Sequence, residues 1–215
     1  MLDDDAHFAT KVAVNRRESS EDVWQRFFEE NTWIFGYGLS YIFNSPLDDR
    51  QLEQSIKGND ITGGGKRVDA LLKTQGLVSA FAFGEIKTHT TKLLKPVAEA
   101  YRGESWQVSD EFSGGIAQVH RSVQLSLKSI DSKREITTVG GVPTGEKIYN
   151  YRPRSFLVIG SLSEFETAQG INEQKYSSFE LFRRNLMSPE VITFDELYER
   201  AKYIVESSAK AAAAP

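Results

Sequence analysis

An apolar run in the middle of the chain constrains the fold more than any other segment. Residues 78–84 are small, aliphatic or aromatic, with Ser79 as the one polar side chain. A run of this length and composition predicts a β-strand that is covered on both faces. Strands of that kind occur in sheets that lie between layers of helices. The run therefore predicts an α/β fold in which a sheet is flanked by helices.

Charged residues follow the apolar run and end the predicted strand. Side chains alternate between the two faces of a strand, so Glu85 and Lys87 are expected to point the same way. The preceding run, 66–73, also predicts a strand, and a short turn would pair the two strands as a hairpin. This pairing would set Asp69 opposite Glu85 or diagonally near it.

Two carboxylates and an amine at one place indicate a metal-dependent hydrolase. Neighbouring buried carboxylates are unfavourable as anions unless a cation lies between them. Mg²⁺ takes oxygen ligands and is commonly held by one or two carboxylates together with substrate phosphates. Lys87 adds a fixed positive charge that can meet an attacking water or a phosphate. The spacing thus predicts metal-assisted phosphodiester hydrolysis, with an exposed salt bridge on the sheet rim as the alternative.

The other elements are predicted from capping residues and from the spacing of apolar residues. Ser19 is expected to cap a helix whose first turn is acidic. Further elements are expected in this order: a strand at 39–43 with a turn at Pro46, a helix at 110–130, a loop tip at 140–145, a strand at 155–160, a helix through 176–186, a strand at 191–193 and a helix at 195–206. This order predicts a mixed central β-sheet flanked by helices.

The predicted domain limits follow from composition. Residues 1–18 are polar and are expected to be a flexible lead-in, residues 19–208 form one domain, and the alanine-rich residues 209–215 are expected to be a disordered tail.

Composition excludes several classes of site. The chain has no cysteine and three scattered histidines, so a thiolate or zinc-type metal site is not expected. It has no apolar run long enough to cross a membrane and no secretion-signal pattern, which predicts a cytoplasmic protein without a membrane partner. The net charge of −4 argues against a generally basic nucleic-acid surface but allows a local basic cleft.

Further residues are candidates for the same site. Gln118 follows two glycines in the helix after the hairpin, where a helix start could face an anionic substrate. The alternative for Gln118 is an exposed helix residue. Glu21 could reach the site as a third carboxylate, although helix capping also explains it. The candidate DNA contacts are Arg67, Thr88, His89 and Arg121; for His89, capping or solvent exposure is the alternative.

Several motifs together resemble the Shedu family. They are Trp24-Gln25-Arg26-Phe27-Phe28-Glu29-Glu30-Asn31, Trp33-Ile34-Phe35-Gly36, Arg67-Val68-Asp69, Gly84-Glu85-Ile86-Lys87 and Ser113-Gly114-Gly115-Ile116-Ala117-Gln118. Shedu proteins are bacterial anti-phage defence proteins whose catalytic domain belongs to the PD-(D/E)XK nuclease superfamily. The similarity covers roughly residues 20–130 and, more loosely, the rest. Val68 stands where the superfamily has proline, which leaves the Asp…Glu-x-Lys triad intact.

The resemblance implies a restriction-endonuclease-like core and Mg²⁺-dependent DNA endonuclease activity, with Mn²⁺ as a substitute. It implies Asp69, Glu85 and the Ile86 carbonyl as metal ligands, Lys87 as the residue that positions or activates water, and Gln118 as a supporting residue. It also implies double-stranded phage DNA as substrate and a homo-oligomer, either a dimer or a tetramer. The alternatives are a restriction or repair nuclease of the same superfamily and a catalytically silent DNA-binding or assembly module.

Overall fold

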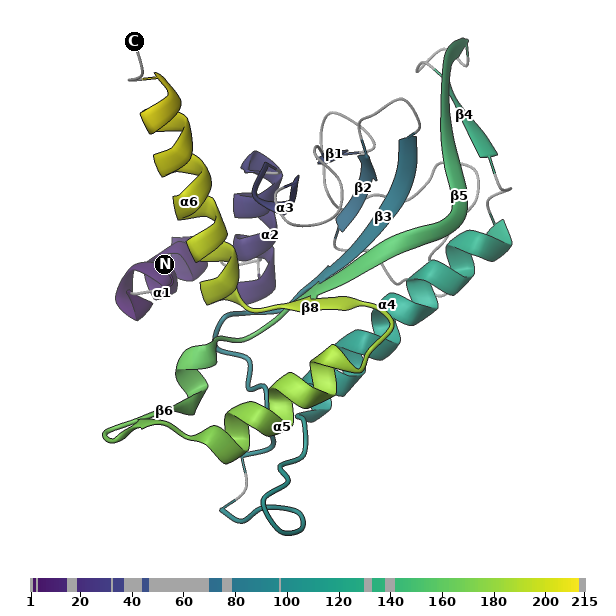
Figure 1. Cartoon of the computed structure of the whole chain (residues 1–215). Coiled ribbons are helices and arrows are strands. Elements are labelled where there is room, and N and C mark those ends of the chain that lie inside the picture. Colours follow the sequence, from purple (N-terminus) through teal and green to yellow (C-terminus); the bar gives the residue numbers. More distant parts are fainter. Residues whose placement is uncertain are drawn as a thin grey trace.

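The fold is mixed α/β, with helices on both sides of a central sheet (Figure 1). The computed structural model describes residues 2, 4–14, 19–31, 33–36, 44–46, 70–74, 79–96, 98–129, 133–137 and 142–212. Within this part of the chain, no helix is both long enough and apolar enough to cross a membrane.

The sheet has the strand order β1-β2-β3-β5-β4, and β8 pairs with β5. Its strands are β1 (Asn44–Pro46), β2 (Ala70–Thr74), β3 (Ser79–Ile86), β4 (Lys133–Thr137), β5 (Pro143–Val158) and β8 (Glu190–Ile192). Strands β3, β5 and β8 are parallel, whereas β1–β2, β2–β3 and β4–β5 are antiparallel. The predicted mixed sheet is therefore confirmed. A separate hairpin joins β6 (Glu166–Thr167) and β7 (Gly170–Ile171).

Two apolar clusters cover the two faces of the sheet. One packs side chains of β2, β3, β5 and β8 against α1 (Asp5–Val14), α2 (Ser20–Glu30), α3 (Trp33–Gly36) and α6 (Phe194–Ala212). The other packs β5 and β8 against α4 (Asp110–Ser129), α5 (Glu173–Arg184) and the 3₁₀ turn Leu162–Phe165. Neighbouring residues of β5 belong to different clusters, Phe156 and Val158 to the first and Leu157 to the second, as strand alternation requires.

The predicted start of α2 is confirmed in detail. Ser19 is the N-cap, its hydroxyl accepts a hydrogen bond from the Asp22 backbone, and the Asp22 carboxylate accepts one from the Ser19 backbone. This reciprocal capping box satisfies donors that a helix start leaves unpaired. Trp24 and Phe28, one turn apart, then bury their rings against the sheet. The cap therefore fixes where α2 begins and which of its faces points inward.

The predicted hairpin is confirmed for the part that the structure describes. Strands β2 and β3 pair antiparallel, with Ala70 opposite Gly84 and Leu72 opposite Ala82. Asp69 and Arg67 lie outside the described residues, as do the predicted strand at 39–43 and the turn between β2 and β3.

Two local predictions differ from the structure, and some elements or parts of elements were not predicted. Pro46 is the last residue of β1 rather than a turn, and the predicted loop tip at 140–145 overlaps the start of β5 at Pro143. Strand β4 was not predicted. Helix α1 was not predicted, and its Phe8 packs into the first apolar cluster. Helix α6 continues to Ala212, beyond the predicted helix end at residue 206, since alanine is a strong helix former.

Candidate active site

Glu85 and Lys87 form a buried ion pair where β3 ends. The Lys87 ammonium lies 3.0 Å from Oε1 of Glu85, and the two side chains are 9% and 6% exposed, respectively. The Lys87 backbone N–H still donates to the Val158 carbonyl, at 2.9 Å, so pairing with β5 holds the chain in place up to this residue. The alternative of an exposed salt bridge on the sheet rim is therefore wrong. Burying two charges costs desolvation energy, which makes a purely stabilising role a poor explanation for them.

A second carboxylate reaches the same lysine from α2. Oε1 of Glu21 lies 3.6 Å from the Lys87 ammonium, and the Glu21 side chain is 44% exposed. Glu21 thus occupies the solvent side of the pair. Asp22 fills the acidic position of the capping box, and Glu21 also lies in the acidic first turn of α2. The sequence-based suggestion that Glu21 reaches the site is confirmed for its contact with Lys87.

Helix α4 approaches the strand next to Glu85. In the parallel pairing of β3 with β5, Glu85 is opposite Leu157. Gly115 of α4 lies against Leu157 so closely that a Cβ at Gly115 would be 3.0 Å from a Leu157 methyl carbon. The glycine therefore permits a close helix–sheet contact beside the ion pair. In the sequence, a Gly-Gly pair inside an otherwise helical pattern indicated a special position. It did not indicate that Gly115 would contact Leu157.

Gln118 lies one turn after Gly115 and is half-buried. Residues three apart on a helix are neighbours on its surface, so Gln118 lies near the helix face that meets β5. However, α4 begins at Asp110, and the unpaired backbone donors belong to its first turn. The predicted helix start at Asp110 is confirmed, so the unpaired backbone donors lie about two turns before Gln118, and the role of Gln118 in the site stays a prediction.

Phe81 and Phe83 precede Glu85 on the same face of β3. Both rings are fully buried and their centroids are 6.3 Å apart. Side chains two residues apart on a strand share a face. The ion pair therefore adjoins a dry, aromatic part of the sheet, where a charge is weakly screened.

His89 is buried, so its expected solvent exposure is wrong. Its Nδ1 accepts a hydrogen bond from Nε1 of Trp24 at 3.1 Å, and its ring contacts Phe8, Trp24 and Phe194. The aromatic spacing that marked α2 gave no indication of this partner. His89 joins the loop after β3 to helices α1, α2 and α6.

The remaining candidate residues are placed as follows. The Thr88 hydroxyl lies 3.0 Å from that of Thr90 and 2.9 Å from that of Thr91. Arg121 is exposed on α4 and donates to Gln124 at 2.7 Å. The Ile86 side chain packs in the core, and metal binding by its carbonyl stays a prediction.

The acidic side chains of this site offer oxygen ligands. Carboxylate oxygens of Glu85 and Glu21 lie 3.0 Å and 3.6 Å from the Lys87 ammonium, and oxygen is the ligand type that Mg²⁺ prefers. Among the described residues, no three or more His, Cys, Asp or Glu residues form a group that could hold a metal ion. Asp69, the predicted further ligand, lies outside that part of the chain.

These features define a mixed α/β domain that buries an acid–lysine pair at the end of a central strand. The chain belongs to the Shedu family: residues 18–198 match the family described as Shedu protein SduA, C-terminal. The sequence is 31% identical over 192 residues to the Shedu protein SduA of Bacillus cereus (strain B4264). That alignment covers 87% of this chain and 46% of the relative, so the chain spans about half the length of this curated relative.

Proposed function

We propose that this protein is a metal-dependent DNA endonuclease of the PD-(D/E)XK type that acts in bacterial anti-phage defence. The observation that carries the proposal is the buried pair of Glu85 and Lys87, 3.0 Å apart at a strand end. Membership of the Shedu family supports the same assignment.

Glu85 and Asp69 are the proposed metal ligands, with the Ile86 carbonyl as a third. Asp69 immediately precedes Ala70 in the sequence, and Ala70 pairs with Gly84, the residue before Glu85. Glu21 is a further carboxylate donor within reach of the same lysine. A bound Mg²⁺ or Mn²⁺ would polarise the scissile phosphate and supply an activated water.

Lys87 is the proposed stabiliser of negative charge that develops on the phosphate. Its ammonium is held by two carboxylates, Glu85 at 3.0 Å and Glu21 at 3.6 Å, so it is oriented before substrate arrives. A preorganised charge in a poorly solvated place stabilises a transition state more strongly than the same charge in water. Gln118 is proposed to hold the attacking water or a phosphate oxygen from the α4 side.

A DNA cleavage assay tests the proposal. Circular and linear double-stranded DNA are incubated with the protein, with and without Mg²⁺, and resolved on a gel. We expect Mg²⁺-dependent cleavage that Glu85→Gln lowers by about 10³-fold or more, since a metal ligand and the partner of Lys87 are lost together. Glu206→Gln, an exposed acid on α6, serves as the matched control and should cleave normally.

Circular dichroism must show that Glu85→Gln is folded. Mg²⁺-dependent cleavage that survives in this variant would overturn the assignment. DNA binding without cleavage by the unmodified protein, in Mg²⁺ or Mn²⁺, would instead indicate a DNA-binding module.

A further inference from the structure

Strands β4 and β5 project together beyond the end of α4 and are called here the β4–β5 arm, residues 133–137 and 143–152 (Figure 1). One face of the arm is anchored to α4. Ile148 and Asn150 are buried, and the Asn150 amide donates to the backbone carbonyl of Ser126 at 3.2 Å. Ser126 is itself fully buried. The arm is therefore fixed to the body of the protein through this face.

The opposite face of the arm is aromatic and basic. Tyr149 and Tyr151 stack, with centroids 5.9 Å apart and planes at 23°, and Tyr151 is 71% exposed. Lys133 is the cross-strand partner of Tyr149, and Lys147 lies two residues before it. Both lysines are exposed. Glu135, opposite Lys147, is the acidic residue on this face.

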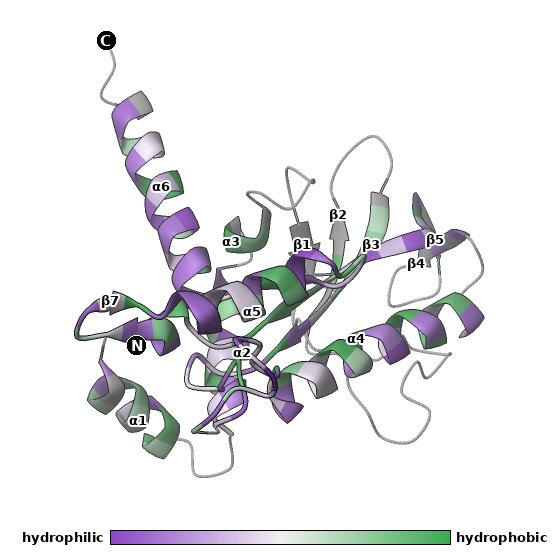
Figure 2. Ribbon diagram, turned by 60° about the horizontal axis from the view of Figure 1, so that its bottom comes forward, coloured by the Kyte–Doolittle hydropathy of each residue, from purple (hydrophilic) through white to green (hydrophobic). Residues whose placement is uncertain are grey.

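This face carries two lysines and one glutamate among its described side chains. The whole chain carries a net charge of −4, yet two lysines adjoin Tyr149. Figure 2 colours much of this part of β5 as hydrophilic. An aromatic ring as exposed as Tyr151 contributes little to packing, because most of its surface stays in water.

We propose that the β4–β5 arm binds single-stranded DNA, with bases stacked on the tyrosine pair and phosphates near Lys133 and Lys147. Exposed aromatic rings between basic side chains are the arrangement that binds unpaired strands, since every base has a face that can stack. Bases within a duplex are already stacked on each other and cannot use the rings. The choice of DNA as ligand rests on the proposed nuclease function.

A binding experiment tests the stacking. The full chain carrying Glu85→Gln is titrated, in EDTA, into a fluorescently labelled thymidine oligonucleotide, and anisotropy is recorded. We expect Tyr151→Ala to weaken binding by about tenfold, whereas Tyr151→Phe keeps it because the ring remains. Tyr203→Ala, which removes a ring 56% exposed on α6, is the matched control and should bind normally.

Salt dependence tests the charges. Replacing Lys133 and Lys147 by glutamine should reduce the slope of log affinity against log salt concentration by about 1.4, because each phosphate contact on a single strand contributes about 0.7. The control is the same replacement of Lys202 and Lys210, two exposed lysines of α6, which should leave the slope unchanged.

The outcomes separate this inference from the nuclease proposal. Unchanged single-strand binding by Tyr151→Ala would overturn the inference, and so would an equal loss of duplex and single-strand affinity. If the unmodified protein cleaves DNA in either case, the nuclease proposal stands. If it cleaves nothing while Tyr151→Ala loses single-strand binding, the inference stands and the nuclease proposal fails.

Discussion

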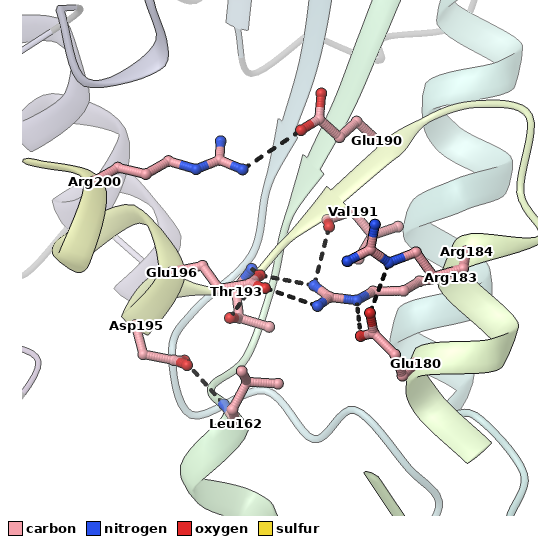
Figure 3. Close-up of polar contacts among 10 residues, drawn as sticks. All are labelled: Leu162, Glu180, Arg183, Arg184, Glu190, Val191, Thr193, Asp195, Glu196 and Arg200. Carbon is pink, nitrogen blue, oxygen red and sulfur yellow. Dashed lines mark hydrogen bonds and ion pairs between the residues drawn. The ribbon is translucent and has the colours of Figure 1, made fainter. Parts of the chain in front are cut away.

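Two charged clusters in this protein are built differently. At the end of β3, one ammonium, that of Lys87, is shared between the carboxylates of Glu85 and Glu21. Between α5 and α6, the guanidinium of Arg183 binds Glu196 with two parallel hydrogen bonds of 2.7 Å (Figure 3). The first cluster is centred on a point charge and the second on a planar fork with fixed directions.

The Arg183 cluster is saturated by its neighbours. Arg183 also donates to Glu180 at 2.6 Å, and Glu196 accepts from both the backbone and the hydroxyl of Thr193. These bonds join α5 to the start of α6 across the end of β8. We therefore expect these two ion pairs, both with little exposure, to have different roles. The Arg183 cluster joins two helices, whereas the Lys87 pair lies at a strand end, where the proposed function would set it beside the substrate.

The largest expected difference between the clusters is in catalysis. Lys87→Met should reduce Mg²⁺-dependent DNA cleavage by about 10²- to 10³-fold, the range for removing one preorganised charge donor from a transition state. Arg183→Met should leave the rate per folded molecule unchanged because its contacts lie between α5 and α6. Cleavage rates are measured on plasmid DNA and normalised to the folded fraction. A normal cleavage rate for Lys87→Met would show that Lys87 does not contribute to cleavage.

The second difference is in stability. Arg183→Met should lower the free energy of unfolding by about 3 kcal/mol, because it leaves partly buried carboxylates without their partner. The Arg183 side chain is 8% exposed, whereas that of Arg184, which also binds Glu180, is 76% exposed. Arg184→Met is therefore the matched control and should have a much smaller effect. Urea denaturation measures both, and equal losses would mean that burial does not distinguish the two arginines.

The third difference is in the response to acid. Burial raises the pKa of Glu196, but hydrogen bonds from Arg183 and Thr193 outweigh it, so the pKa lies below its usual 4.5. The pKa of Glu180 is lowered in the same way by Arg184 and Arg183, against its own burial. A lowered folded-state pKa gives stability that is present above the unfolded pKa and is lost as pH falls through the folded value.

These two carboxylates therefore bind protons more readily in the unfolded chain than in the folded protein. The protein should lose stability as the pH falls below about 4.5. The free energy of unfolding of Arg183→Met should fall less over the same pH interval, because this variant lacks the arginine that lowers the two pKa values. Thermal melts at a series of pH values from 7 to 3 measure the two slopes. Parallel slopes would show that the Arg183 cluster does not control the acid response.

The two clusters also differ in how far the sequence predicted them. Alternation along β3 placed Glu85 and Lys87 on one face, and the capping signal at Ser19 brought Glu21 close to them. These are local rules, and they identified this part of the site. Arg183 and Glu196 are thirteen residues apart, and no periodicity relates them because their contact depends on how α5 and α6 pack. The same limit applies to His89, whose partner Trp24 is 65 residues away.

The smallest expected effects test how closely α4 must approach the site. Gly114 and Gly115 are neighbours in α4, but a Cβ at Gly114 would meet nothing within 4 Å, whereas one at Gly115 would lie 3.0 Å from Leu157. Gly114→Ala should therefore stabilise the protein by about 0.5–1 kcal/mol through helix propensity. Gly115→Ala should destabilise it by about 1 kcal/mol, since overpacking against a fully buried leucine exceeds that gain.

Because Leu157 pairs with Glu85 in the sheet, Gly115→Ala should also slow cleavage, and Gly114→Ala should not. Thermal melts and cleavage rates of the two variants decide the matter: if both alanines stabilise and both cleave normally, the contact of α4 with β5 does not position the site.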